Sequence, residues 1–249
     1  EPLGNWVDAD GLTDGMTIAL NDSLQKVRGL KVPGWISSMT FKGATNLLSA
    51  GRGLQVDHLL VGRVARAGDQ LRFSLSLDRT DGGPPLWSTN YVRKQSDIFA
   101  LQSEIAHQVA GALKLTLGVQ ERQDLDRKVT DSPEAFDLYL KGRAAWNWRT
   151  IPEFMRATNF FGQALAKDAN FALAYAGLAD VHTLWPIYSG EPPGLHSSET
   201  IKFARLALEK DPRIAEPHAA LSTDEGLTGI GEASLAGRAE RRRGCRTTG

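Results

Sequence analysis

The sequence predicts an α+β fold in two parts, a small layered α/β domain followed by an all-α solenoid of helical repeats. Three observations support this. A β-hairpin pattern lies between amphipathic helices in the first half, two helical stripes meet across a short connection at residues 154–182, and this helical unit recurs downstream.

The stretch 154–182 predicts two helices joined by a few residues. Apolar side chains repeat at helical spacing on both sides of Lys167-Asp168-Ala169-Asn170, which puts one continuous stripe on each helix. The first stripe contains Ala157, Phe160, Phe161, Ala164 and Leu165, and the second contains Ala172, Tyr175, Leu178, Ala179 and His182. The small alanines allow the helix backbones to approach closely, so we expect an αα-hairpin.

The hairpin pattern recurs along the chain. The run ALAKDA at 164–169 returns as ALEKDP at 207–212, the run at 171–179 returns at 215–222, and residues 136–142 have the pattern of an earlier first helix. A single hairpin cannot cover its own apolar face, so such units must stack on one another. The sequence therefore predicts a repeat solenoid in the second half.

The first half alternates helix and strand signals. We expect a helix capped by Thr13, a short strand at 30–32, and a second helix at 44–52. A hairpin at 58–66 and 71–78 turns at 67–70, and a third strand at 86–93 precedes a long helix that carries apolar residues from 98 to 113. No strand is expected before the first helix, which would leave the sheet without a neighbour at that edge.

Composition limits the classes of function. The 249 residues are 41% hydrophobic, enough for two cores, and the 29 basic residues equal the 29 acidic ones, so overall charge gives no argument for nucleic acid or an anionic membrane. We expect a soluble chain without a signal peptide or a membrane span. A single cysteine, Cys245, excludes an internal disulfide framework and leaves the compartment, cytoplasm or periplasm, open.

Short runs spread over most of the chain resemble a known architecture. They are DGLT at 10–13, LKV at 30–32, TFKG at 40–43, GRV at 62–64 with GD at 68–69, LW at 86–87, DIFALQSEIA at 97–106, and PEAFDLYLKGR at 133–143. This order is similar to a TolB-like domain of the amino-terminal type followed by tetratricopeptide repeats, as found in bacterial multidomain signalling proteins. Gln55 stands where such relatives place a helix-ending glycine, and Ala169 stands where the repeat has proline.

The resemblance implies domain limits and a role. Residues 1–118 would form the TolB-like domain with a truncated start, 119–131 a helical connector, 132–222 the repeats, and 223–249 a divergent, disordered tail. In such proteins these domains accompany a serine/threonine kinase, an adenylate cyclase or a winged-helix DNA-binding domain, and this sequence contains none of them. The resemblance therefore implies a non-catalytic module, whose membrane side depends on a span upstream.

Few motifs indicate an enzyme or a metal site. Ser23 and Lys26 have the S-x-x-K spacing of some serine hydrolases without the companion motifs, so we interpret them as a solvated helix face. Asp8, Asp10 and Asp14 lack the closing glutamate of a calcium loop. The five histidines show no metal-binding spacing, and His182 is expected to pack in the repeat core. We expect no cofactor, no metal and no small-molecule substrate.

The candidate site is instead a groove that binds a protein or a peptide. Stacked repeats expose a concave surface, and the side chains predicted to face it are Tyr139, Arg143, Trp146, Leu173, Asp180 and Thr183. Alternatively, Trp146 and Trp148 cover the junction with the first domain. A second alternative is nucleic-acid binding by the arginine-rich end at 238–246, which lacks the aromatic residues needed for base stacking.

Overall fold

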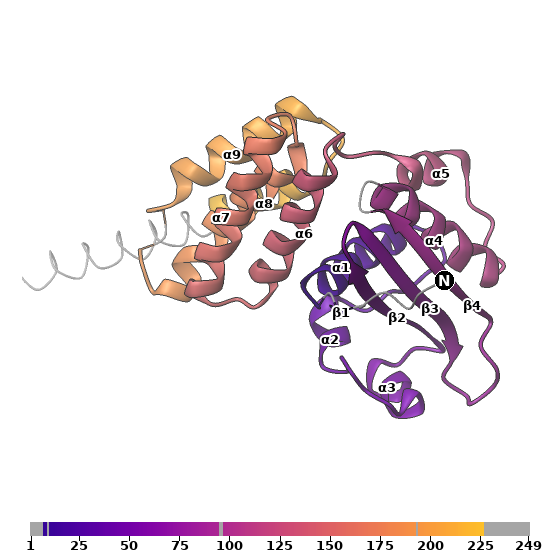
Figure 1. Ribbon diagram of the computed structural model, residues 1–249. Coiled ribbons are helices and arrows are strands. Elements are labelled where there is room, and N and C mark those ends of the chain that lie inside the picture. The colour runs from indigo at the N-terminus through magenta and orange to yellow at the C-terminus, as the bar shows by residue number, and fades with distance from the viewer. Residues whose placement is uncertain (1–6, 9, 95–96, 193, 227–249) are drawn as a thin grey trace, which may run out of the picture. The chain divides into compact units, whose positions relative to one another are not determined.

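The computed structural model describes residues 7–8, 10–94, 97–192 and 194–226 (Figure 1). The chain divides into two compact units, Glu1–Pro133 and Glu134–Gly249. The first unit combines helices with an antiparallel sheet and the second is helical in its described part, which confirms the predicted α+β class. Within the described ranges, none of the helices has the length and apolar character needed to cross a bilayer.

The sheet of the first unit is an antiparallel meander. Strands β1 (Val7–Asp8), β2 (His58–Ala67), β3 (Gln70–Arg79) and β4 (Trp87–Lys94) follow one another in sequence order (Figure 1). Ala67 pairs with Gln70 across a two-residue turn in which Gly68 has a φ of 61°, so the predicted hairpin is confirmed. The expectation of no strand before the first helix was wrong, because Val7 and Asp8 pair with Arg66 and Ala65.

One face of the sheet is buried. Side chains of β3 alternate along the strand, and Leu71, Phe73, Leu75 and Leu77 all point into the core, as the sequence predicts. Helices α1 (Asp10–Gln25) and α4 (Ile98–Ala112) contact each other, and they contact β2 and β4 respectively. Their apolar faces are buried, so the first core lies between these two helices and the sheet.

Two local predictions for this unit were wrong, and one helix was not predicted. Helix α1 begins at Asp10, so Thr13 lies inside it, where its carbonyl accepts a hydrogen bond from the Thr17 hydroxyl (2.8 Å). Residues 30–34 form no ladder with any described strand; instead, the Asn21 side-chain amide donates to the carbonyl of Pro33 (2.9 Å). A short helix, α2 (Trp35–Met39), follows this stretch and was not predicted.

Helix α3 (Leu47–Leu54) ends in a conformation that normally favours glycine. It begins later than predicted, and Asn46 accepts a hydrogen bond from the backbone of Ser49 at its start. Its C-cap, Gln55, has φ 56° and ψ 47°, the left-handed region. TolB-like domains place a helix-ending glycine at this position, so this chain tolerates a strained residue there.

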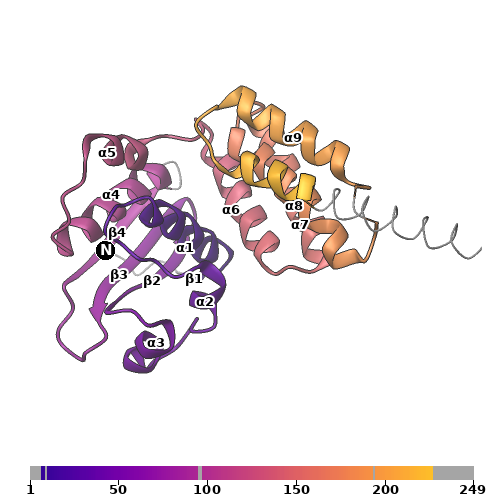
Figure 2. The same ribbon diagram turned by 180° about the vertical axis from the view of Figure 1, so that it is seen from behind.

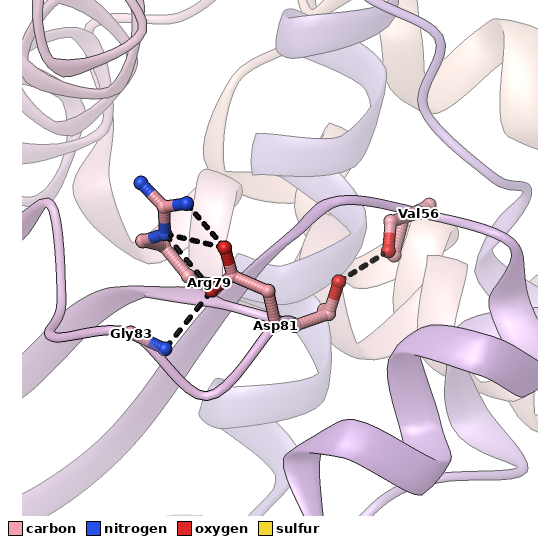
Figure 3. A network of polar contacts seen from close by, with 5 residues as sticks. Val56, Arg79, Asp81 and Gly83 are labelled. Carbon is pink, nitrogen blue, oxygen red and sulfur yellow. Dashed lines mark hydrogen bonds and ion pairs between the residues drawn. The ribbon is translucent and has the colours of Figure 1, made fainter.

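The connection from β3 to β4 is fixed by Asp81 (Figure 3). The Asp81 carboxylate accepts hydrogen bonds from the Arg79 guanidinium and from the backbone N–H of Gly83 (2.9 Å), which hold the pKa of that carboxyl well below its usual range. The neighbouring Thr80 hydroxyl donates to the carbonyl of Val56 (2.8 Å) and ties this connection to the end of α3. A further helix, α5 (Val119–Asp126), follows α4.

The second unit is a series of helices joined by short connections. They are α6 (Pro133–Asn147), α7 (Ile151–Lys167), α8 (Ala172–Ser189), α9 (Ser197–Lys210) and a helix at residues 216–226 (Figure 2). The helices α7 and α8 pack together on either side of Asp168, which confirms the predicted hairpin. Residues 223–226, assigned to the tail, continue the last helix, and residues 227–249 lie outside the described residues.

One aromatic ring on α7 packs against both α6 and α8. Phe161 on α7 has no exposed surface, and its ring lies against Gly142 of α6 and Gly177 of α8. A Cβ atom added at either glycine would lie 2.5 Å from the ring, far inside van der Waals contact. Tyr139 and Phe171 complete the cluster. The ring centroid of Tyr139 lies 5.9 Å from that of Phe161 and 5.2 Å from that of Phe171. The absence of a side chain at both glycines therefore sets how closely the helices approach.

Candidate functional site

An ion pair joins α6 to α8 at the centre of the predicted groove. Arg143 follows Gly142, and Asp180 follows Ala179, so both emerge beside the close helix contacts of this unit. The Arg143 guanidinium donates to the Asp180 carboxylate at 3.2 Å, and the two side chains are 13% and 16% exposed. The sequence predicted that both residues face the same groove, and the structure brings them together.

The protonation of Asp180 is poised near neutral pH. Burial of the carboxyl raises its pKa to about 6, the Glu216 carboxylate adds to this rise, and Arg143 and Arg149 oppose it. With a pKa of about 6, this carboxyl is mostly ionised at pH 7 and takes up a proton as the pH falls through about 6. The net charge of the site therefore responds to any cation or anion brought close to it.

Trp146 lies between two guanidinium groups. The Arg143 and Arg149 side chains lie over its indole ring at 4.8 Å and 3.6 Å from the ring centroid. Its Nε1 is buried and has no hydrogen-bond acceptor among the described residues. Arg149 has a left-handed backbone with φ 54°, and burial lowers the pKa of its guanidinium. We call Arg143, Trp146, Arg149 and Asp180 the arginine–tryptophan cluster.

The other predicted groove residues lie apart from this cluster. Tyr139 is 8% exposed and packs in the aromatic core with Phe161 and Phe171. Thr183 is buried, and its hydroxyl donates to the carbonyl of Ala179 (2.8 Å). Leu173 is half-buried against a separate apolar cluster that contains Ala207 and Ile214. These three side chains stabilise the helix packing.

Arg149 was missed by the sequence reasoning. It lies beyond the end of α6, in the connection to α7, where helical periodicity assigns no face. The signal available in the sequence was the pair of cations at positions 143 and 149, spaced on either side of Trp146. Arginine and aromatic side chains together are typical of binding hot spots.

The enzyme-like motifs have other partners. The Ser23 hydroxyl accepts a hydrogen bond from the Gln102 side chain (2.9 Å), and within the described ranges no hydrogen bond joins it to the Lys26 ammonium group. Asp14 pairs with Lys42 (2.7 Å). No group of three or more histidine, cysteine, aspartate or glutamate side chains in the described part of the chain is arranged to hold a metal ion. The arginine-rich end at 238–246 lies outside the described residues.

Comparison with known proteins finds a partial similarity to a longer protein. The chain is 36% identical over 170 residues to a protein named Putative adenylate cyclase 3 from Rhizobium meliloti (strain 1021). The aligned segment covers 67% of this chain and 28% of that protein, so the chain spans less than a third of its relative. No protein-family model matches the sequence.

Proposed function

We propose that this chain is a non-catalytic sensory and interaction module of a bacterial signalling protein. It consists of a TolB-like domain followed by tetratricopeptide repeats, and it binds an acidic peptide segment of a partner protein through the arginine–tryptophan cluster. The observation that carries the proposal is the cluster itself, in which two arginines flank an indole at a contact between neighbouring helices.

Helix packing in the second unit supports a repeat scaffold. Each helix of the α7–α8 pair buries small residues against its neighbour, and α8 packs in turn against α9. The recurring sequence runs place equivalent residues at equivalent points. Asp168 and Asp211 each follow the end of a helix, and their backbone N–H groups donate to the carbonyls of Ala164 and Ala207 respectively. Repeats of this kind commonly bind extended segments of partner proteins.

The similarity to a protein named as an adenylate cyclase supports a signalling role for the protein in which this module would act. It favours the alternative that the module is the regulatory part of a cyclase, whose catalytic domain lies outside this chain, over a kinase or a winged-helix regulator. In that arrangement, a partner bound to the repeats would change the output of the cyclase.

The chemistry of the cluster favours an acidic partner. The guanidinium of Arg149 is partly buried, which lowers its pKa, and the Asp180 carboxyl near it is itself buried, with its pKa raised to about 6. A carboxylate supplied by a partner would pair with Arg149 and draw it away from the indole. The face of Trp146 and its buried Nε1 would then be accessible to the partner's backbone.

Random peptides displayed on phage test this proposal. Peptides that bind the full chain should be enriched in aspartate and glutamate, and a selected peptide should bind Arg149→Gln at least about tenfold more weakly, since a charge-assisted hydrogen bond contributes about 1.5–3 kcal/mol. The matched control is Arg156→Gln, which removes an exposed arginine that pairs with Glu153 on α7 and should leave affinity unchanged. Fluorescence polarisation measures both affinities. Selected peptides without acidic residues, or equal loss in both variants, would contradict the proposed binding mode.

A further inference from the structure

Two histidines meet where α8 is joined to α9. The Nδ1 atoms of His182 on α8 and His196 just before α9 lie 3.0 Å apart. The Nε2 of His196 lies 3.0 Å from the carboxylate of Glu191. Trp185 stacks on His196 with ring centroids 5.4 Å apart, and Phe203 of α9 stacks on His182 at 5.6 Å. These contacts hold His196, at the far end of the α8–α9 connection (residues 190–192 and 194–196 of the described chain), against α8.

These distances allow one arrangement of hydrogens in the neutral pair. An ionised Glu191 only accepts hydrogen bonds, so the hydrogen of neutral His196 is on Nε2 and its Nδ1 is an acceptor. His182 must then donate its own Nδ1 hydrogen to His196. A hydrogen bond between two Nδ1 atoms contains a single hydrogen. The bond is therefore lost when both Nδ1 atoms are protonated.

We propose that the His182–His196 pair is a proton-sensitive latch, which keeps the α8–α9 connection closed until the pair has taken up two protons from solvent. The first proton adds to the free Nε2 of His182 and leaves the shared hydrogen in place. The second proton has only the Nδ1 of His196 to bind, so two hydrogens and two cations would face each other across 3.0 Å. The connection then opens.

The charged groups around the pair tolerate one added proton. Glu191 contacts His196, and Glu199 in the first turn of α9 favours protonation of His182. On the remaining sides, Lys202 lies over the Phe203 ring, and Asp224 of the last helix accepts a hydrogen bond from Ser197 (2.8 Å). Burial and the neighbouring His196 lower the pKa of His182.

The backbone at this end of α8 is weakly held, so the side-chain contacts matter more. Pro186 lies inside the helix and has no N–H to donate to the carbonyl of His182. The helix ends at Gly190, whose φ of 74° starts the connection. Loss of the histidine contact therefore removes the hydrogen bond between the α8 side chain of His182 and His196 at the far end of the connection.

The direction of the pH effect follows from the proton count. An open connection has sites for two protons, whereas the closed one has a site for one, on the Nε2 of His182. The closed fraction therefore falls as pH decreases, by up to about tenfold per pH unit for each extra proton that the open connection binds. This response goes beyond the proposed binding function and does not depend on any partner.

Histidine side-chain NMR of the full chain tests the latch. Between pH about 8 and about 5, the signals of His182 and His196 should change together, with one proton bound first and the second only at clearly lower pH. Amide protection factors, which already account for the intrinsic pH dependence of exchange, should fall over the same range for Gly190, Glu191, Gly194, Leu195 and His196. Two independent titrations near the ordinary value would overturn the proposal.

Three variants separate the latch from general acid destabilisation. His182→Phe keeps an aromatic ring against Phe203 without a titrating group, and His196→Gln keeps a neutral partner for His182; both should give protection in the connection that no longer depends on pH. His218→Asn removes an exposed histidine of the same unit and should leave the wild-type response intact. An acid-dependent loss that persists in both latch variants would refute the mechanism.

Discussion

Replacement of Gly142 by alanine should destabilise the helical unit, because the ring of Phe161 has no room to move. The added Cβ would lie 2.5 Å from the Phe161 ring, which is about 1 Å inside normal contact. The ring cannot retreat, since Gly177 of α8 lies on its other side with no more room than Gly142: a Cβ added at Gly177 would also lie 2.5 Å from the ring. Overpacking of this kind costs about 3 kcal/mol, and the higher helix propensity of alanine returns about 1 kcal/mol. We expect a net loss of about 2 kcal/mol.

Urea unfolding followed by circular dichroism at 222 nm measures this loss, which should lower the melting temperature by about 8 °C. Gly162→Ala, on the exposed side of α7 with no atom near its added Cβ, is the matched control and should gain about 1 kcal/mol. In the Phe161→Leu background, the cost of Gly142→Ala should fall by at least half. An equal cost in both backgrounds would refute the explanation based on the ring.

Three further predictions concern single side chains. Gln55→Gly should stabilise the first unit by about 1 kcal/mol in urea unfolding, because it relieves the left-handed C-cap of α3, and a loss would contradict this account. Gly51→Ala should destabilise the same unit by about 2 kcal/mol, since its Cβ would lie 2.2 Å from the Thr80 methyl group. The folded-state pKa of Asp180, about 6 against an ordinary 3.8, means that the native state binds this proton more tightly than the unfolded chain. Its contribution to stability should therefore fall by about 3 kcal/mol as pH rises from about 4 to about 6. Asp180→Asn, whose amide oxygen still accepts from Arg143, should abolish that fall relative to wild type in unfolding curves taken across this interval.

Long periodic segments were predictable because their own residues contain the signal. The α7–α8 hairpin and the β2–β3 hairpin follow from apolar spacing and from the Gly68-Asp69 turn, and the structure confirms both. The strand expected at 30–32 failed for a different reason. A strand needs a neighbouring ladder, and a chain flanked by Gly29 and Pro33 carries no information on whether one is present.

The site was only partly predictable because the sequence of one helix does not specify which residues of another helix it contacts. Periodicity put Arg143 and Asp180 on facing surfaces, but it could not show that they neutralise each other at 3.2 Å. It gave no role to Arg149, which lies outside any helical face. Nor could it bring His196 back to His182, because the Pro- and Gly-rich connection between them sets that distance through its length rather than its pattern.

The placement of Phe161 between two helices other than its own determines how a disturbance passes through the unit. A shift of α6 toward or away from α7 must displace that rigid ring, and the ring in turn pushes on α8 without any movement of the connecting loops. Mechanical coupling of this kind is short-ranged and stiff. A displacement of α6 would therefore reach α8 directly, as a change in the spacing between the helices.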